Sequence, residues 1–199
     1  MFNGLRKMRE LKREEKQAAK AYVETDETGR EIVRMRVQRD DGFLSPYSLG
    51  DSRVISSDVA DFLDNAVKPL TLKRDISLVV SSDEIDDEEK TEYRAAVKNH
   101  YRNRSIDVNR RLKNNGRASL IMALIGAGIL ALYVALGLRE VGTVFLEIID
   151  ITAWVFMWEA VDLFFFERNA LKIEKLRCLR LRDAEIVYKP LTEKRSEEI

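Results

Sequence analysis

Four carboxylates interrupt a part of the sequence that is otherwise almost wholly apolar: Glu147, Asp150, Glu159 and Asp162. An ionised acid near the centre of a bilayer costs about 2.5–3.5 kcal/mol on insertion scales. Such a group must be protonated, paired or hydrated. It can mark an ion path, or it can hold helices together as a hydrogen-bonded contact. The sequence predicts that these four acids serve an ion path or an assembly interface, and it leaves both readings open.

The acids are not scattered around the predicted helix. At about 100° per residue, most of them share one stripe roughly 120° wide with two aromatic side chains. Glu159 lies at the edge of this stripe. The opposite surface is apolar and suits lipid, so we expect the stripe to face protein or water. The stripe consists of Glu147, Asp150, Trp154, Trp158 and Asp162.

Two apolar segments, residues 118–138 and 141–166, are long enough to cross a membrane. The first carries no charge, and at about 1.5 Å per residue it reaches roughly 31 Å, the thickness of a hydrocarbon core. Only a short connection containing Arg139 and Glu140 separates the two segments. We therefore expect an antiparallel transmembrane hairpin.

Small residues on the first segment favour a close helix contact. Gly126 and Gly128 lie among alanines, and a tight connection would bring Gly126 opposite Trp154. We expect Trp154 and Trp158 to pack against the glycines, because both tryptophans lie in the middle of the second segment rather than at its ends.

The same register suggests how some of the acids are neutralised. Arg117, at the start of the first segment, would lie near Glu159 and Asp162, and we expect an ion pair there. Asp150 meets only apolar residues of its own hairpin. It therefore needs a proton, water or a partner from another chain.

Basic residues flank the outer ends of both segments, whereas the connection carries only Arg139. The positive-inside rule then places both termini in the cytoplasm. Residues 1–20 lack the apolar core of a signal peptide, so the hairpin itself would direct insertion into a bacterial inner membrane. The single cysteine, Cys178, suits a reducing compartment. The flanking basic residues are Arg102, Arg104, Arg110, Arg111, Lys113 and Arg117 before the hairpin, and Arg168, Lys172, Lys175, Arg177, Arg180 and Arg182 after it.

The charged regions on either side of the hairpin predict a small α+β domain. We expect residues 1–117 to form a cytoplasmic α+β region with a long stalk helix, residues 118–166 the transmembrane hairpin, and residues 167–199 a helix, a strand and a charged tail. Alternation of apolar and polar residues predicts three strands that form one small sheet. The expected strands are 31–38, 75–81 and 184–188, with helices at 57–67 and from residue 83, and a kink at 114–116.

No catalytic signature accompanies this architecture. The sequence has no phosphate-binding loop, no dinucleotide-binding glycine pattern and no paired-cysteine metal site, and His100 is its only histidine. Its balanced charge argues against binding nucleic acid. We therefore expect no enzyme activity, no cofactor and no resident metal.

Three functions remain as hypotheses. The leading one is a non-enzymatic homo-oligomer in the lipid bilayer whose carboxylates line a cation or proton path. The alternative is an adaptor or regulatory subunit whose acids pair with basic residues of a partner membrane protein. A metal-dependent membrane enzyme is disfavoured, because Asp150 and Glu159 lie about 13 Å apart along one helix and cannot share an ion.

Overall fold

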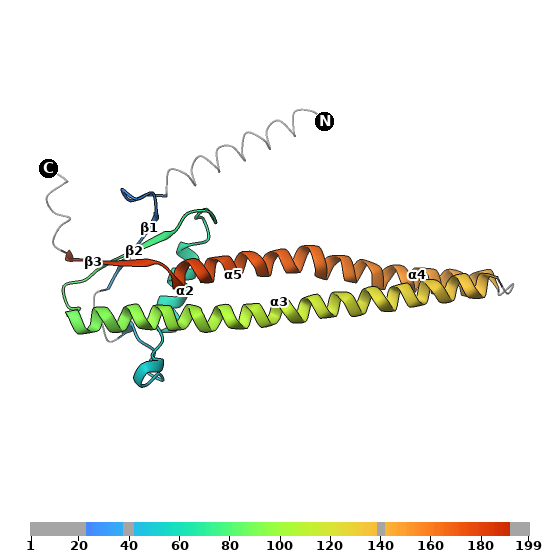
Figure 1. The fold of residues 1–199 in the computed structure, drawn as a ribbon, viewed down its shortest axis with the longest axis horizontal. Helices are drawn as coiled ribbons and strands as arrows, with labels where there is room; N and C mark the ends of the chain where they lie inside the picture. The colour runs from blue at the N-terminus through green and yellow to red at the C-terminus, as the bar shows by residue number, and fades with distance from the viewer. Residues whose placement is uncertain (1–22, 38–41, 139–141, 192–199) are drawn as a thin grey trace, which may run out of the picture. The chain divides into compact units, whose positions relative to one another are not determined.

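The structure, a computed structural model, describes residues 23–37, 42–138 and 142–191 (Figure 1). The chain divides into two compact units. Of the described residues, unit 1 contains 23–37, 42–103 and 177–191, and unit 2 contains 104–138 and 142–176. In chain order the elements are β1 (Glu31–Arg36), η2 (Gly50–Ser52), α2 (Ser57–Ala66), β2 (Ile76–Ser81), α3 (Asp87–Gly137), α4 (Thr143–Val161), the π-helical segment η3 (Asp162–Glu167), α5 (Arg168–Arg182) and β3 (Glu185–Lys189).

A three-stranded parallel sheet forms the centre of unit 1, with the order β1-β2-β3 (Figure 1). Leu78 of β2 pairs with Val33 on one side and with Ile186 on the other. Residues 76–80 of β2 are all buried. A central parallel strand is covered on both faces, which explains its nearly continuous apolar sequence. The three-stranded sheet predicted from the sequence is confirmed.

Helices α2, α3 and α5 contribute side chains to the core around this sheet. Leu63 of α2, Tyr101 of α3 and Leu181 of α5 are almost fully buried. The ring of Phe43 stacks on Tyr93, with centroids 4.3 Å apart. Helix α2 is capped by Ser56, whose side chain accepts a hydrogen bond from the Val59 amide. The N-cap is therefore Ser56, one residue before Ser57, which the sequence suggested as the N-cap.

Unit 2 contains the C-terminal part of α3, with α4, η3 and the first residues of α5. The expected first span is not a separate helix, because residues 118–137 belong to the 51-residue helix α3. This helix runs without interruption through Gly116, where we expected a kink. No proline breaks the helix between 87 and 137, and a single glycine is tolerated within a helix.

By length and composition α3 could cross a membrane, and it is the only described helix that passes this test. Helix α4 carries three acids, Glu147, Asp150 and Glu159, within its 19 residues. One apolar helix is by itself weak evidence, since the core helix of a soluble protein can pass the same test. In this chain, however, only 6% of the apolar window of α3 is buried. The fold thus contains one long apolar helix, and the two-helix transmembrane hairpin expected from the sequence is not established by it.

Candidate functional site

Three of the four predicted site acids lie on α4 and the fourth, Asp162, begins η3. Helix α4 packs against α3 (Figure 1). Its contact face uses small residues: Ala153 and Ala160 are buried. The Ser119 hydroxyl of α3 donates a hydrogen bond of 2.9 Å to the Ala160 carbonyl. Alanine and serine let the two backbones approach closely. This contact fixes the rotation of α4 and so determines where each acid points.

The contact leaves most of the predicted stripe uncovered. Glu147, Glu159 and Asp162 are exposed, and Asp150 is half-buried beside the contact face. Trp154 and Trp158 are 59% and 67% exposed. We call Glu147, Trp154, Trp158 and Asp162 the acid–tryptophan stripe, since they follow one another along the exposed face of α4 and the start of η3.

None of the four acids has a side-chain hydrogen bond or an ion pair within the described part of the chain. The half-buried Asp150 is the most consequential case, because water reaches it less freely than it reaches the other three. An acid without a partner beside apolar surface requires a proton, water or a group from another molecule.

The packing expected at Gly126 is corrected by the structure. A Cβ at Gly126 would lie 3.0 Å from the Sδ of Met157 and 3.3 Å from the Ala153 carbonyl oxygen, whereas one at Gly128 would meet nothing within 4 Å. Trp154 and Trp158 are turned toward the exposed face instead. The predicted register is right to within one residue, but one residue turns a helix by about 100°. The physical reason is that alanine permits a closer helix approach than tryptophan does.

The expected ion pair between Arg117 and Asp162 or Glu159 is also corrected. These three side chains are exposed, and no ion pair joins them in the described structure. Arg117 precedes the contact residue Ser119 by two positions, and Asp162 follows the contact residue Ala160 by two. A displacement of two residues turns a side chain by roughly 200°, so both point away from the contact.

Sequence reasoning missed a groove in unit 2, where the polar part of α3 meets its apolar part. We call it the boundary groove, and its volume is about 600 Å³. Asn115 is 8% exposed and donates a hydrogen bond of 2.8 Å from Nδ2 to Glu167 Oε2. The Oδ1 of the same amide is buried without a hydrogen-bond partner in the structure. The groove includes Arg111, Asn115, Ala118, Leu163, Glu167 and Glu174.

Arg111 and Glu174 form a looser contact in the same groove. Arg111 Nη1 lies 3.6 Å from one carboxylate oxygen of Glu174, and Arg104 Nη2 lies 3.7 Å from the other. The sequence analysis predicted only a kink at residues 114–116. It could not predict the groove, because no local pattern shows which side chain a neighbouring helix will bury. The π-helical segment η3 gives the groove its wall, and such segments are frequent at functional sites.

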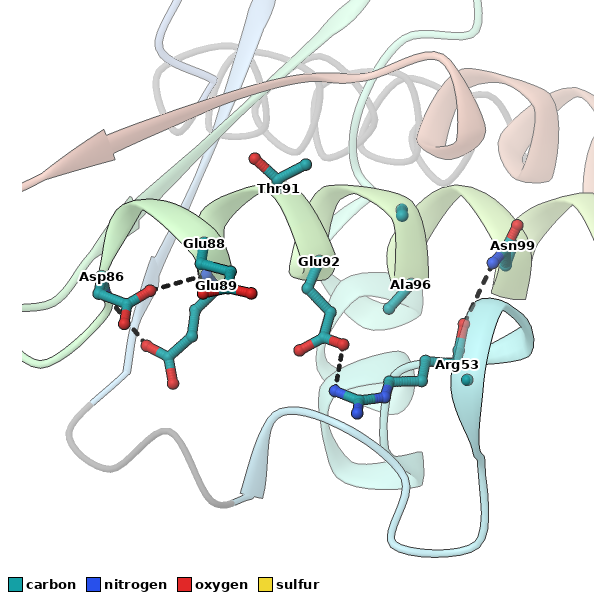
Figure 2. A pocket seen from close by; sticks show the side chains of 10 residues that line it. Arg53, Asp86, Glu88, Glu89, Thr91, Glu92, Ala96 and Asn99 are labelled. Atoms are coloured by element: carbon teal, nitrogen blue, oxygen red, sulfur yellow. Dashed lines mark hydrogen bonds and ion pairs between the residues drawn. The ribbon is translucent and has the colours of Figure 1, made fainter.

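A second cavity, of about 790 Å³, lies in unit 1 beside the N-terminus of α3 (Figure 2). Three of the acids that line it have partners: Glu92 pairs with Arg53, and Asp86 and Glu89 exchange hydrogen bonds with each other's backbone amides. Acids at this position cap the helix and complement its dipole. Among the described residues no group of acids, cysteines or histidines could hold a metal ion.

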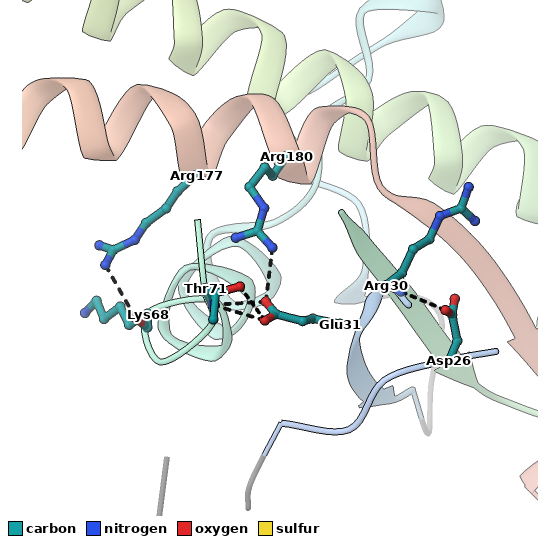
Figure 3. Close-up of polar contacts among 7 residues, drawn as sticks. All are labelled: Asp26, Arg30, Glu31, Lys68, Thr71, Arg177 and Arg180. Atoms are coloured by element: carbon teal, nitrogen blue, oxygen red, sulfur yellow. Dashed lines mark hydrogen bonds and ion pairs between the residues drawn. The ribbon is translucent and has the colours of Figure 1, made fainter. Parts of the chain in front are cut away.

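A buried ion pair joins β1 and α5 within unit 1 (Figure 3). Glu31 of β1 is 1% exposed, and Arg180 Nη2 of α5 lies 3.2 Å from its carboxylate. Thr71 donates to the same carboxylate from its amide and its hydroxyl, the latter at 2.7 Å. Three donor groups thus contact the Glu31 carboxylate within the fold, so we interpret this ion pair as structural.

Comparisons with protein-family models, with curated proteins and with solved structures found no match. The function must therefore be argued from the residues and their geometry.

Proposed function

We propose that this chain is a non-enzymatic subunit of a membrane homo-oligomer, and that the carboxylates of α4 and η3 line a path for cations. The observation that carries this proposal is the uncovered acid–tryptophan stripe, together with the half-buried Asp150. These acids find no partner within the described part of their own chain.

The uncovered acids support the proposed function because a bilayer penalises exposed charge. An ionised acid that faces lipid is penalised by about 2.5–3.5 kcal/mol near the bilayer centre. A second copy of the chain can cover the stripe, because exposed tryptophans are typical anchors of protein interfaces. Symmetry then brings equivalent acids together around an axis, and rings of carboxylates attract cations.

In this proposal the apolar part of α3 and the segment α4–η3 both cross the inner membrane of a bacterium. Both ends of the chain then lie in the cytoplasm, because basic residues flank the two segments on the same side. Ser119 and Gly126 support the proposal, since they hold the two helices together and leave the acid-bearing face for contacts between subunits.

The oligomeric state is the first test. We expect the full chain in detergent to have a mass of several subunits at micromolar concentration, by light scattering with the detergent contribution subtracted. A strict monomer would contradict the proposal. Trp158→Ala should weaken assembly, whereas Tyr47→Ala, at an exposed site of unit 1, should leave it unchanged.

Cation flux into liposomes is the second test. A cation about 4 Å from a carboxylate gains about 4 kcal/mol at an effective dielectric constant of 20. We therefore expect Asp150→Asn or Glu147→Gln to reduce flux on the order of tenfold or more. Asp107→Asn is the matched control, because Asp107 is exposed on α3 outside the apolar segment. An intact oligomer that conducts nothing would point instead to an adaptor whose acids pair with a partner membrane protein.

A further inference from the structure

Asn115, which lines the boundary groove, carries an unpaired hydrogen-bond acceptor. The hydrogen bond from Nδ2 to Glu167 identifies the donor end of the Asn115 amide, so Oδ1 is its acceptor end. This Oδ1 is buried and has no donor in the structure. Leaving a buried acceptor unpaired costs about 1–3 kcal/mol, so such an atom calls for a ligand with a hydrogen-bond donor.

The charged residues of the groove indicate which hydrogen-bond donor a ligand should carry. Glu167 and Glu174 both line it, and Arg111 lies close enough to compensate Glu174 in part. Glu167 contacts the neutral amide of Asn115 instead. A carboxylate beside an unpaired carbonyl oxygen suits a small cation that carries N–H groups, which is a primary ammonium.

The position of the groove indicates which kind of molecule would carry the ammonium group. Residues 118–138 of α3 carry no charge, and Ala118 and Leu163 line the apolar end of the groove. Arg111 lines the groove about one helical turn before Asn115. A phospholipid can thus place its phosphate near Arg111 and its acyl chains along the apolar helices.

We propose that the boundary groove binds the headgroup of a phospholipid that carries a primary ammonium, of the phosphatidylethanolamine class. Its ammonium donates hydrogen bonds to Asn115 Oδ1 and to the Glu167 carboxylate. This inference rests on the membrane location in the proposed function, but not on oligomerisation or cation flux.

Headgroups without these donors fit the groove poorly. The ammonium of phosphatidylcholine is fully methylated and has no N–H group, so it cannot satisfy Asn115 Oδ1. A phosphatidylglycerol headgroup carries a net negative charge and would be repelled by Glu167 and Glu174. The two lipids therefore separate the hydrogen bond from the charge in a binding experiment.

The experiment measures lipid binding to the full chain in detergent by native mass spectrometry. The three lipids carry identical acyl chains and differ only in ethanolamine, choline or glycerol headgroups. We expect the ethanolamine lipid to bind on the order of tenfold more tightly than the other two, which is the effect of losing one charged hydrogen bond.

Two variants assign the preference to the groove. Glu167→Gln keeps an acceptor for Asn115 Nδ2 and should fold, yet it should abolish the preference for ethanolamine. Asn115→Leu should do the same, whereas Asn169→Leu, at an exposed position of α5, should leave the preference intact. Equal binding of ethanolamine and choline lipids would overturn the inference, as would a preference that survives Glu167→Gln.

Three further results would distinguish a failure of this inference from a failure of the proposed function. Soluble phosphoethanolamine that competes as strongly as the lipid would overturn the lipid as the source of the ammonium. A monomeric chain that still prefers the ethanolamine lipid would contradict the proposed homo-oligomer and support the groove. An oligomer that conducts cations but shows no headgroup preference would overturn this inference alone.

Discussion

Tyr188 is a half-buried side chain that links the sheet to α3. It lies on β3, and its hydroxyl donates a hydrogen bond of 3.0 Å to the Lys90 carbonyl. Burial raises the pKa of Tyr188 to about 12, although the nearby positive charge of Arg94 acts in the opposite direction. The folded chain thus favours the neutral phenol.

This pKa gives the free energy of unfolding a dependence on alkaline pH. Because the pKa is higher in the folded chain than in the unfolded chain, the contribution is complete below about pH 10. It is lost as the pH rises toward about 12. We expect a loss of about 1 kcal/mol after allowance for solvent screening. Denaturant titrations at several pH values should show a smaller decline in Tyr188→Phe, and no such change in Tyr47→Phe. An identical decline in all three proteins would contradict the assignment.

The contact between α3 and α4 depends on which small residues face each other. Gly126 meets Ala153 and Met157, whereas Gly128, two residues farther along α3, faces open space in this chain. The two glycines belong to the same helix and the same sequence context. They therefore form a matched pair for testing the packing.

We expect Gly126→Leu to lower the free energy of unfolding by about 1–3 kcal/mol, because the added side chain must push α4 away. Gly126→Ala should have a smaller effect, since the flexible side chain of Met157 can shift. Gly128→Leu should be neutral or slightly stabilising, because leucine is the better helix former. Thermal unfolding in detergent, followed by circular dichroism, measures all three. Equal destabilisation by leucine at both positions would mean that α4 packs on a different face of α3.

At the scale of the whole chain, Glu31 and Arg180 join segments separated by 149 residues. Their contact holds β1 and the C-terminal part of α5 together within unit 1 (Figure 3). Arg180 Nε and Nη1 are buried without partners in the structure, so the guanidinium depends strongly on its one carboxylate.

Removing Arg180 leaves the Glu31 charge buried and uncompensated. We expect Arg180→Met to lower the free energy of unfolding by about 3–5 kcal/mol. Adding Glu31→Leu should recover part of the loss, since no buried charge then remains. The more exposed pair of Arg182 and Asp183 is the control, and Arg182→Met should change stability by about 1 kcal/mol or less. A double variant no more stable than Arg180→Met would show that the pair itself is not the cause.

Local sequence patterns were enough to predict most of the individual helices and strands. Strand β2 could be predicted because branched apolar residues recur within a short segment, and the long apolar part of α3 because residues 118–138 carry no charge. Acidic residues also indicated the start of α3, but the helix begins at Asp87, four residues after the predicted start at residue 83. These features depend on local periodicity and on interactions with the chain's own backbone, which a sequence carries in full.

The way in which these elements face one another could not be predicted from local patterns and is known from the three-dimensional structure. It turned Ala153 rather than Trp154 toward Gly126, buried Asn115 at the boundary groove and paired Glu31 with Arg180. A helix displays a different side chain with every rotation of about 100°, and the sequence fits several rotations almost equally well. Which rotation forms depends on how closely the partner surface can approach, and that closeness is a property of two packed elements rather than of either sequence alone.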